Sequence, residues 1–155
     1  MSTIIKDKAT IMEEVRKLIS EGVTVELKAK GYSMNPFIMH MRDKLFLGPW
    51  EDNEIRKGAV VLVKDRRGFY LVHRIIERNG DEITLMGDGN IGLKEKADVK
   101  EVIGILKAIK RKGRTYNTAD SKVWRLYSTL WTWLTPLRRW PLGLWRRLNP
   151  QQPLQ

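Results

Sequence analysis

Hydrophobic residues recur along the chain first at helical and then at strand spacing. Between residues 11 and 19 they fall three or four positions apart, and Gly22 closes the pattern, which predicts an amphipathic helix within residues 1–22. From Val23 to Lys30 apolar and polar residues strictly alternate, which predicts a strand with one buried face. The helix can then cover one side of a sheet that includes this strand.

Further strand-like segments follow at short intervals, separated by Gly, Asn and Asp. We predict strands at residues 44–47, 59–63, 69–76, 82–86 and 102–109. Short strands this close together favour a small antiparallel barrel or folded sheet. The sequence therefore predicts a mainly β protein in three parts: an N-terminal amphipathic helix in residues 1–22, a β domain in residues 23–115, and a helical tail in residues 116–155.

The tail differs chemically from the rest of the chain. The formal net charge is +11, and no acidic residue follows Asp120, whereas five of the six tryptophans do. Trp and Leu interleaved with Arg match a segment that lies on an anionic lipid surface, and Pro136 and Pro141 predict two short helices. A helical hairpin that packs on the domain or on a partner protein explains the same composition. Both interpretations stay open for residues 121–148.

Composition also excludes some chemistry and some locations. The chain has no cysteine, which excludes a disulfide framework, a thiolate metal site and a cysteine nucleophile. No zinc, calcium or phosphate-loop pattern is present, so we expect no metal and no other cofactor. Residues 1–22 lack the apolar core of a secretory signal, and residues 126–137 are too few for the roughly 20 apolar residues that span a bilayer. We expect a cytoplasmic protein, or one held peripherally at the inner face of a membrane.

A serine that follows the first predicted strand is the most informative candidate for catalysis. Residues 31–36 read Gly-Tyr-Ser-Met-Asn-Pro, which places Ser33 between a glycine and a proline just after a half-buried strand. A serine hydroxyl is a weak nucleophile unless an adjacent base removes its proton. The question is therefore which residue of the chain can act as that base.

The chain contains two histidines that could activate this serine. His73 lies in the strand predicted at residues 69–76, where alternation places it in an apolar row that starts at Phe69. A histidine in such a row can equally be a core residue satisfied by a hydrogen bond, and this alternative stays open. His40 is closer to Ser33 in sequence but lies in a segment typical of a turn. A strand holds a side chain more rigidly than a turn does, which is one of two reasons to favour His73 as the general base; the other is the resemblance described below.

A third candidate is Asp88, which follows the strand predicted at residues 82–86. The segment 86–90 reads Met-Gly-Asp-Gly-Asn, and its glycines let the chain turn sharply and bring the carboxylate near other strands. Asp-Gly is also a frequent dipeptide in tight hairpin turns, so a purely structural role is the alternative.

Three segments form a set that is characteristic of one protease clan. They are Gly-Tyr-Ser-Met-Asn-Pro at 31–36, Gly-Ala-Val-Val at 58–61 and Gly-Asp-Gly-Asn at 87–90. In content and order they resemble the Gly-x-Ser-Met, Gly-x-Val-Val and Gly-Asp-x-Asn boxes of the signal peptidase I and LexA-like serine proteases. Bacterial members place a lysine before an arginine where this chain has His73 and Arg74, so it is similar to the Ser-His branch, the endoplasmic-reticulum and archaeal type.

The resemblance implies a LexA or signal-peptidase-like coiled β-barrel and a serine endopeptidase that cleaves a peptide or protein leader in trans. It assigns Ser33 as the nucleophile that forms an acyl-enzyme, His73 as the general base, and Asp88 as the carboxylate that orients the ring or shapes the site. Gly31 and Met34, beside Ser33, would contribute to substrate binding and to the oxyanion site, with the Ser33 backbone N–H as a donor.

Other functions fit parts of the sequence. A noncatalytic adaptor that keeps the fold and binds a membrane or a partner protein through its tail is the alternative from a different class. The basic run at residues 107–114 suggests nucleic acid, but no nucleic-acid motif accompanies it, so we do not expect that partner. Self-cleavage of the LexA kind is disfavoured, because only 32 residues precede Ser33, too few for a DNA-binding domain.

Overall fold

The computed structural model describes residues 7–118 and 121–150, which form strands flanked by helices. The strands are β1 (Val25–Lys28), β2 (Asp43–Gly48), β3 (Val60–Lys64), β4 (Tyr70–Asn79), β5 (Glu82–Met86), β6 (Glu95–Asp98), β7 (Val102–Arg111) and β8 (Arg114–Asn117). The helices are α1 (Lys8–Ser20), α2 (Lys122–Trp133) and α3 (Arg139–Leu148), with short 3-10 turns η1 (Asp52–Glu54), η2 (Val99–Glu101) and η3 (Thr135–Leu137).

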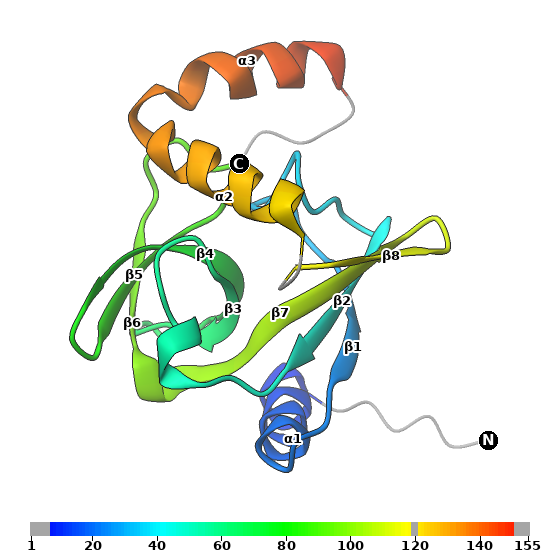
Figure 1. Cartoon of the computed structure of the whole chain (residues 1–155), viewed down its shortest axis with the longest axis vertical. Helices are drawn as coiled ribbons and strands as arrows, with labels where there is room; N and C mark the ends of the chain where they lie inside the picture. Colours follow the sequence, from blue (N-terminus) through cyan, green and yellow to red (C-terminus); the bar gives the residue numbers. More distant parts are fainter. Residues whose placement is uncertain (1–6, 119–120, 151–155) are drawn as a thin grey trace.

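The eight strands are antiparallel and curl into a half-barrel (Figure 1). Their order is β1-β2-β7-β3-β4-β5-β6, with β8 paired to β7. The fold is thus mainly β, as predicted, and six strands lie where alternation or apolar runs predict them. The sequence did not predict β6 and β8, because β6 is short and mostly charged and all four residues of β8 are exposed.

The half-barrel is filled by two hydrophobic clusters that meet at β3. Val60 and Leu62 belong to one cluster, and Val61 and Val63 belong to the other, because successive side chains of a strand point to opposite faces. Helix α1 covers the first cluster with Val15 and Ile19. Burial on both faces explains why β3 is a continuous apolar run and not an alternating one.

The apolar row predicted for β4 is one residue shorter than expected. Phe69 precedes the strand and is 58% exposed, with the guanidinium of Arg67 5.2 Å from the centre of its ring. Leu71 and Ile75 do join the second cluster, and His73 is buried. The prediction for Phe69 was wrong, because the chain is still leaving a turn at that residue and has not entered the sheet.

The tail folds as a helical hairpin on one end of the half-barrel. Ser121 caps α2 by accepting a hydrogen bond from the backbone N–H of Trp124 at 3.1 Å. Pro136 lies in η3 between the helices, whereas Pro141 lies in the first turn of α3, where a missing N–H breaks no helical hydrogen bond. Only Pro136 therefore interrupts the helices. Across residues 7–118 and 121–150, none of the helices combines the length and apolarity needed to cross a bilayer.

Asp43, buried at the start of β2, is held by two arginines. Arg42 Nε and Arg111 Nε donate to its Oδ1 at 2.8 and 2.9 Å, and the backbone N–H of Met39 donates to Oδ2 at 3.0 Å. Burial opposes ionisation of this carboxyl, but the hydrogen bonds from both arginines outweigh burial and lower its pKa to about 2. Arg111 also donates to the carbonyl of Phe37 at 2.6 Å, so this group anchors the chain just after the Ser33 turn.

We expect Asp43→Asn to lower the free energy of unfolding at pH 7 by about 2 to 3 kcal/mol, from the pKa difference between about 2 folded and an ordinary 3.9. The stabilisation by the charged form is complete above the unfolded pKa and is lost as pH falls through the folded pKa. The difference between the variant and wild type should therefore shrink between about pH 4 and pH 2. Urea denaturation across this range, with the exposed Asp81→Asn as control, tests this. A difference independent of pH would contradict it.

Candidate active site

The structure brings Ser33 and His73 into hydrogen-bonding distance. Ser33 Oγ lies 2.9 Å from His73 Nε2, although 40 positions separate them in the sequence. Ser33 is partly exposed in the turn after β1, and His73 is only 4% exposed on β4. Strand β4 is paired with β3 and β5 on its two sides, so the sheet fixes the position of the imidazole.

The carboxylate that contacts the ring is Glu95, at the start of β6. Its Oε2 lies 3.0 Å from His73 Nδ1, and the side chain is almost wholly buried. A carboxylate at Nδ1 accepts the N–H of that nitrogen, which leaves Nε2 free to accept the hydroxyl hydrogen of Ser33. Ser33, His73 and Glu95 thus form one chain of hydrogen bonds in the order that activates a serine.

The sequence did not single out Glu95. Its strand is four residues long and reads Glu-Lys-Ala-Asp, in which Glu95 and Ala97 are buried and Lys96 is exposed. The sequence carries no matching signal, because three of the four residues are charged and a buried glutamate leaves no apolar position in the pattern. Register makes Glu95 a member of the site, because it pairs with Leu85 of β5, and Leu85 pairs with Ile75 of β4.

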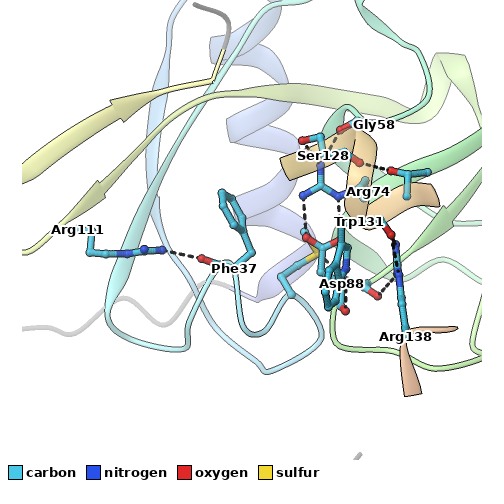
Figure 2. A network of polar contacts seen from close by, with 11 residues as sticks. Phe37, Gly58, Arg74, Asp88, Arg111, Ser128, Trp131 and Arg138 are labelled. Carbon is cyan, nitrogen blue, oxygen red and sulfur yellow. Dashed lines mark hydrogen bonds and ion pairs between the residues drawn. The ribbon is translucent and has the colours of Figure 1, made fainter. Parts of the chain in front are cut away.

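Asp88 does not contact the imidazole and instead binds Arg74. Arg74 Nε donates to Asp88 Oδ1 at 2.8 Å and Nη2 donates to Oδ2 at 2.7 Å, with both side chains fully buried (Figure 2). Adjacent residues of β4 point to opposite faces, so Arg74 meets Asp88 on the face of the strand away from His73. Of the two roles expected for Asp88, orienting the ring falls to Glu95, and shaping the site fits the position of Asp88.

The Arg74–Asp88 pair joins three segments of the candidate site to the tail. Arg74 Nη1 also donates to the Gly58 carbonyl at 2.8 Å and to Ser128 Oγ of α2 at 2.6 Å. Burial by itself would lower the pKa of the Arg74 guanidinium, but the charge of Asp88 and the hydrogen bonds to it keep this pKa above its ordinary value. The rings of Phe37, Trp124 and Tyr127 lie within 6.0 Å of the guanidinium carbon and complete its surroundings.

We expect Asp88→Asn to destabilise the fold by about 3 kcal/mol or more, because it leaves the buried Arg74 charge without its partner. Chemical denaturation of wild type and variant measures the change. The double variant Arg74→Met/Asp88→Asn should be less destabilised than the sum of the two single variants, since they share one interaction. Additive losses, or a loss below 1 kcal/mol for Asp88→Asn, would contradict this role for the pair.

The segment after β5 packs backbone to backbone against the turn that carries Ser33. A Cβ on Gly87 would collide with the Ser33 carbonyl, and a Cβ on Gly89 would lie 2.9 Å from the Tyr32 carbonyl. The Gly89 N–H donates to the Ser33 carbonyl at 2.7 Å. Glycine is required at both positions because any side chain would displace the serine. The Gly-Asp-Gly-Asn segment thus positions the Ser33 backbone.

The other residues proposed around Ser33 have structural contacts. Met34 is buried, and its Sδ accepts the Asp88 N–H at 3.4 Å, so its side chain anchors the turn, while a role of Met34 toward substrate stays a prediction. Gly31 donates its N–H to His40 Nδ1 at 2.9 Å, and the His40 ring packs 5.0 Å from that of Tyr32. His40 therefore holds the turn, whereas His73 faces the serine hydroxyl. The oxyanion role of the Ser33 N–H stays a prediction.

Neither a protein-family model nor a curated protein matches the chain. Within residues 7–118 and 121–150 no group of three or more potential ligands among His, Asp and Glu is arranged to hold a metal ion. The similarity of the three sequence segments to one protease clan therefore stays a prediction. A function for the chain has to be inferred from the geometry of its side chains.

Proposed function

We propose that the chain is a serine endopeptidase that uses Ser33 as nucleophile, His73 as general base and Glu95 as the carboxylate that orients the base. The observation that carries the proposal is the pair of contacts at 2.9 and 3.0 Å that joins the three side chains through the two ring nitrogens. Two such contacts would also satisfy a structural histidine. Catalysis is favoured because Ser33 is partly exposed, so a substrate can reach its hydroxyl.

The chemistry would be acyl transfer in two steps. Ser33 Oγ attacks a peptide carbonyl while His73 Nε2 takes its proton, and Glu95 stabilises the imidazolium that forms. The same proton then passes to the leaving amine, which leaves an acyl-enzyme on Ser33. Water, deprotonated by His73, hydrolyses the ester and regenerates the serine. The Ser33 backbone N–H would donate to the oxyanion in both steps.

The edges of the sheet support a peptide as substrate. β1 and β6 are the two ends of the strand order, and each leads into the site: Ser33 follows β1 by five positions, and β6 begins at Glu95. An extended peptide can add to such an edge through main-chain hydrogen bonds and so lie across the serine. We propose a peptide or protein leader, cleaved in trans, and a half-barrel of the signal-peptidase and LexA type.

Peptide cleavage and covalent labelling together test this proposal. Wild type and Ser33→Ala protein are incubated with a diverse peptide library, with and without liposomes, and products are identified by mass spectrometry. In parallel, a serine-reactive fluorophosphonate is added, and the modified residue is located by peptide mapping. We expect cleavage by wild type only and modification at Ser33. A folded wild type that neither cleaves any peptide nor reacts with the probe would refute the proposal.

A noncatalytic adaptor is the second candidate function. It is favoured by the exposed apolar residues of the hairpin, among them Trp133 at 73% and Trp140 at 69% exposure, which need no catalysis to act. The two functions differ in one genetic result. If cells that carry Ser33→Ala keep the function of the protein, the adaptor is favoured, whereas its loss with an intact fold favours the peptidase.

A further inference from the structure

The tail hairpin leaves an apolar row uncovered on each of its helices, among the described residues. We call the two rows together the hairpin face; its residues are at least half exposed and recur at three- and four-residue spacing. They are Val123, Leu126, Leu130 and Trp133 on α2, and Leu137, Trp140, Leu144 and Leu148 on η3 and α3. The opposite side of the hairpin is already satisfied, since Trp131 and Leu142 are buried. The exposed side is therefore not needed to hold the hairpin on the half-barrel.

The charged residues of the hairpin itself are all positive. Residues 121–150 contain no Asp or Glu. Four of their cations are exposed and flank the apolar rows: Lys122, Arg125, Arg139 and Arg147. A cavity of about 650 Å³ between α2 and the half-barrel is lined by Trp133 and Arg125 and adds Arg56 and Lys57, whereas its Lys107 is paired with Glu54 at 2.9 Å. A surface that binds here must offer negative charge over a wide area.

We propose that the hairpin face docks on the surface of an anionic lipid bilayer. Trp and Leu side chains at this spacing enter the boundary between headgroups and acyl chains, while flanking Arg and Lys bind the lipid phosphates. A bilayer accepts such an array without a matching shape. A protein partner would need an apolar groove the length of both helices, rimmed by carboxylates. The absence of any acidic residue in 121–150 favours the membrane, since an anionic bilayer attracts basic side chains along the whole length of the hairpin.

The inner side of the hairpin connects this docking surface to the catalytic serine. Trp131 Nε1 donates to the Asp88 carbonyl at 3.2 Å, Arg138 Nη1 to that of Gly87 at 3.3 Å, and Arg146 Nη2 to that of Gly89 at 2.9 Å. Figure 2 shows Trp131 and Arg138 directed at this segment. Because the Gly89 N–H binds the Ser33 carbonyl, docking would hold Ser33 at a fixed place near the bilayer, where α3 forms the outermost layer (Figure 1).

Vesicle flotation of the full-length Ser33→Ala protein tests the docking, independently of any catalysis. Vesicles of phosphatidylcholine with phosphatidylglycerol are compared with vesicles of phosphatidylcholine alone, at low and high salt. We expect binding to the anionic vesicles only, and weaker binding at high salt as the charges are screened. Trp133→Ser/Trp140→Ser, and separately Lys122→Gln/Arg147→Gln, should each reduce the partition coefficient about tenfold or more.

Control variants make comparable apolar changes and the same charge loss at exposed positions outside the hairpin. Phe69→Ser/Leu93→Ser removes two residues that are also more than half exposed, and Lys94→Gln/Lys100→Gln removes two exposed cations. These should bind vesicles within about twofold of the parent. Equal losses in control and hairpin variants, or no binding to anionic vesicles, would overturn the proposal. So would a dimer in sedimentation that Trp133→Ser/Trp140→Ser dissolves, because a second copy would then occupy the face.

Discussion

Replacing Ser33 with alanine is expected to reduce kcat/KM for peptide cleavage by at least about 10⁴-fold, because it removes the only atom that can form the acyl-enzyme. His73→Ala should cost about as much, since Ser33 Oγ then has no base at 2.9 Å. The double variant should be no less active than the less active of the two single variants, because the two side chains act as one unit. Single-turnover cleavage of a peptide found in the library screen measures all three.

Loss of folding must be separated from loss of chemistry in these variants. Ser33 is in a turn and only partly buried, so the free energy of unfolding of Ser33→Ala should lie within about 1 kcal/mol of that of wild type. His40→Ala is the matched control for the second histidine. It removes a hydrogen bond to Gly31 but no contact with Ser33 Oγ, and should retain most activity. If His40→Ala is the inactive variant and His73→Ala is active, the assignment of the base is wrong.

Glu95→Gln is expected to reduce kcat about 10²- to 10⁴-fold with little change in KM. The amide keeps the volume of the carboxylate, but it has no charge to stabilise the imidazolium. The new amide can also donate a hydrogen bond to His73 Nδ1. The ring hydrogen would then sit on Nε2, and Nε2 could no longer accept the proton of Ser33. A loss of kcat in Glu95→Gln would show that the Glu95 carboxylate positions the imidazole, because a carboxylate that is merely buried would not favour one tautomer of His73.

A readout other than activity tests the same role of Glu95. In wild type the Nδ1–H of His73 should give a low-field proton resonance, because it lies against a buried carboxylate. The Glu95→Gln variant should lack this resonance. The Glu95→Asp variant keeps a carboxylate and should retain part of the activity. The exposed Glu77→Gln is the matched control and should change neither property. If Asp88→Asn lowers kcat of the folded protein as much as Glu95→Gln does, the carboxylate that assists His73 has been misassigned.

Much of the fold could be predicted because it is recorded in local periodicity. The α1 helix and strands β1 to β5 and β7 each bury one or both faces, and burial leaves a pattern of apolar positions at the spacing of the element. β8 buries nothing and β6 is only four residues long, so neither left a pattern that could be distinguished from a loop. Prediction failed where an element supplied at most one small apolar residue to the core, as β6 does with Ala97.

The sequence by itself singled out Ser33 and His73 as candidates, since the serine follows a strand in a distinctive segment and the histidine lies in an apolar one. Only the tertiary structure decided which carboxylate contacts His73 and which contacts Arg74. Alternation in β4 directs His73 and Arg74 to opposite faces, and strand register then places Glu95 beside the first and Asp88 beside the second. The periodicity of a sequence indicates which residues are buried. The contacts of a buried side chain depend instead on which other strands lie beside it, and that is a property of the tertiary structure.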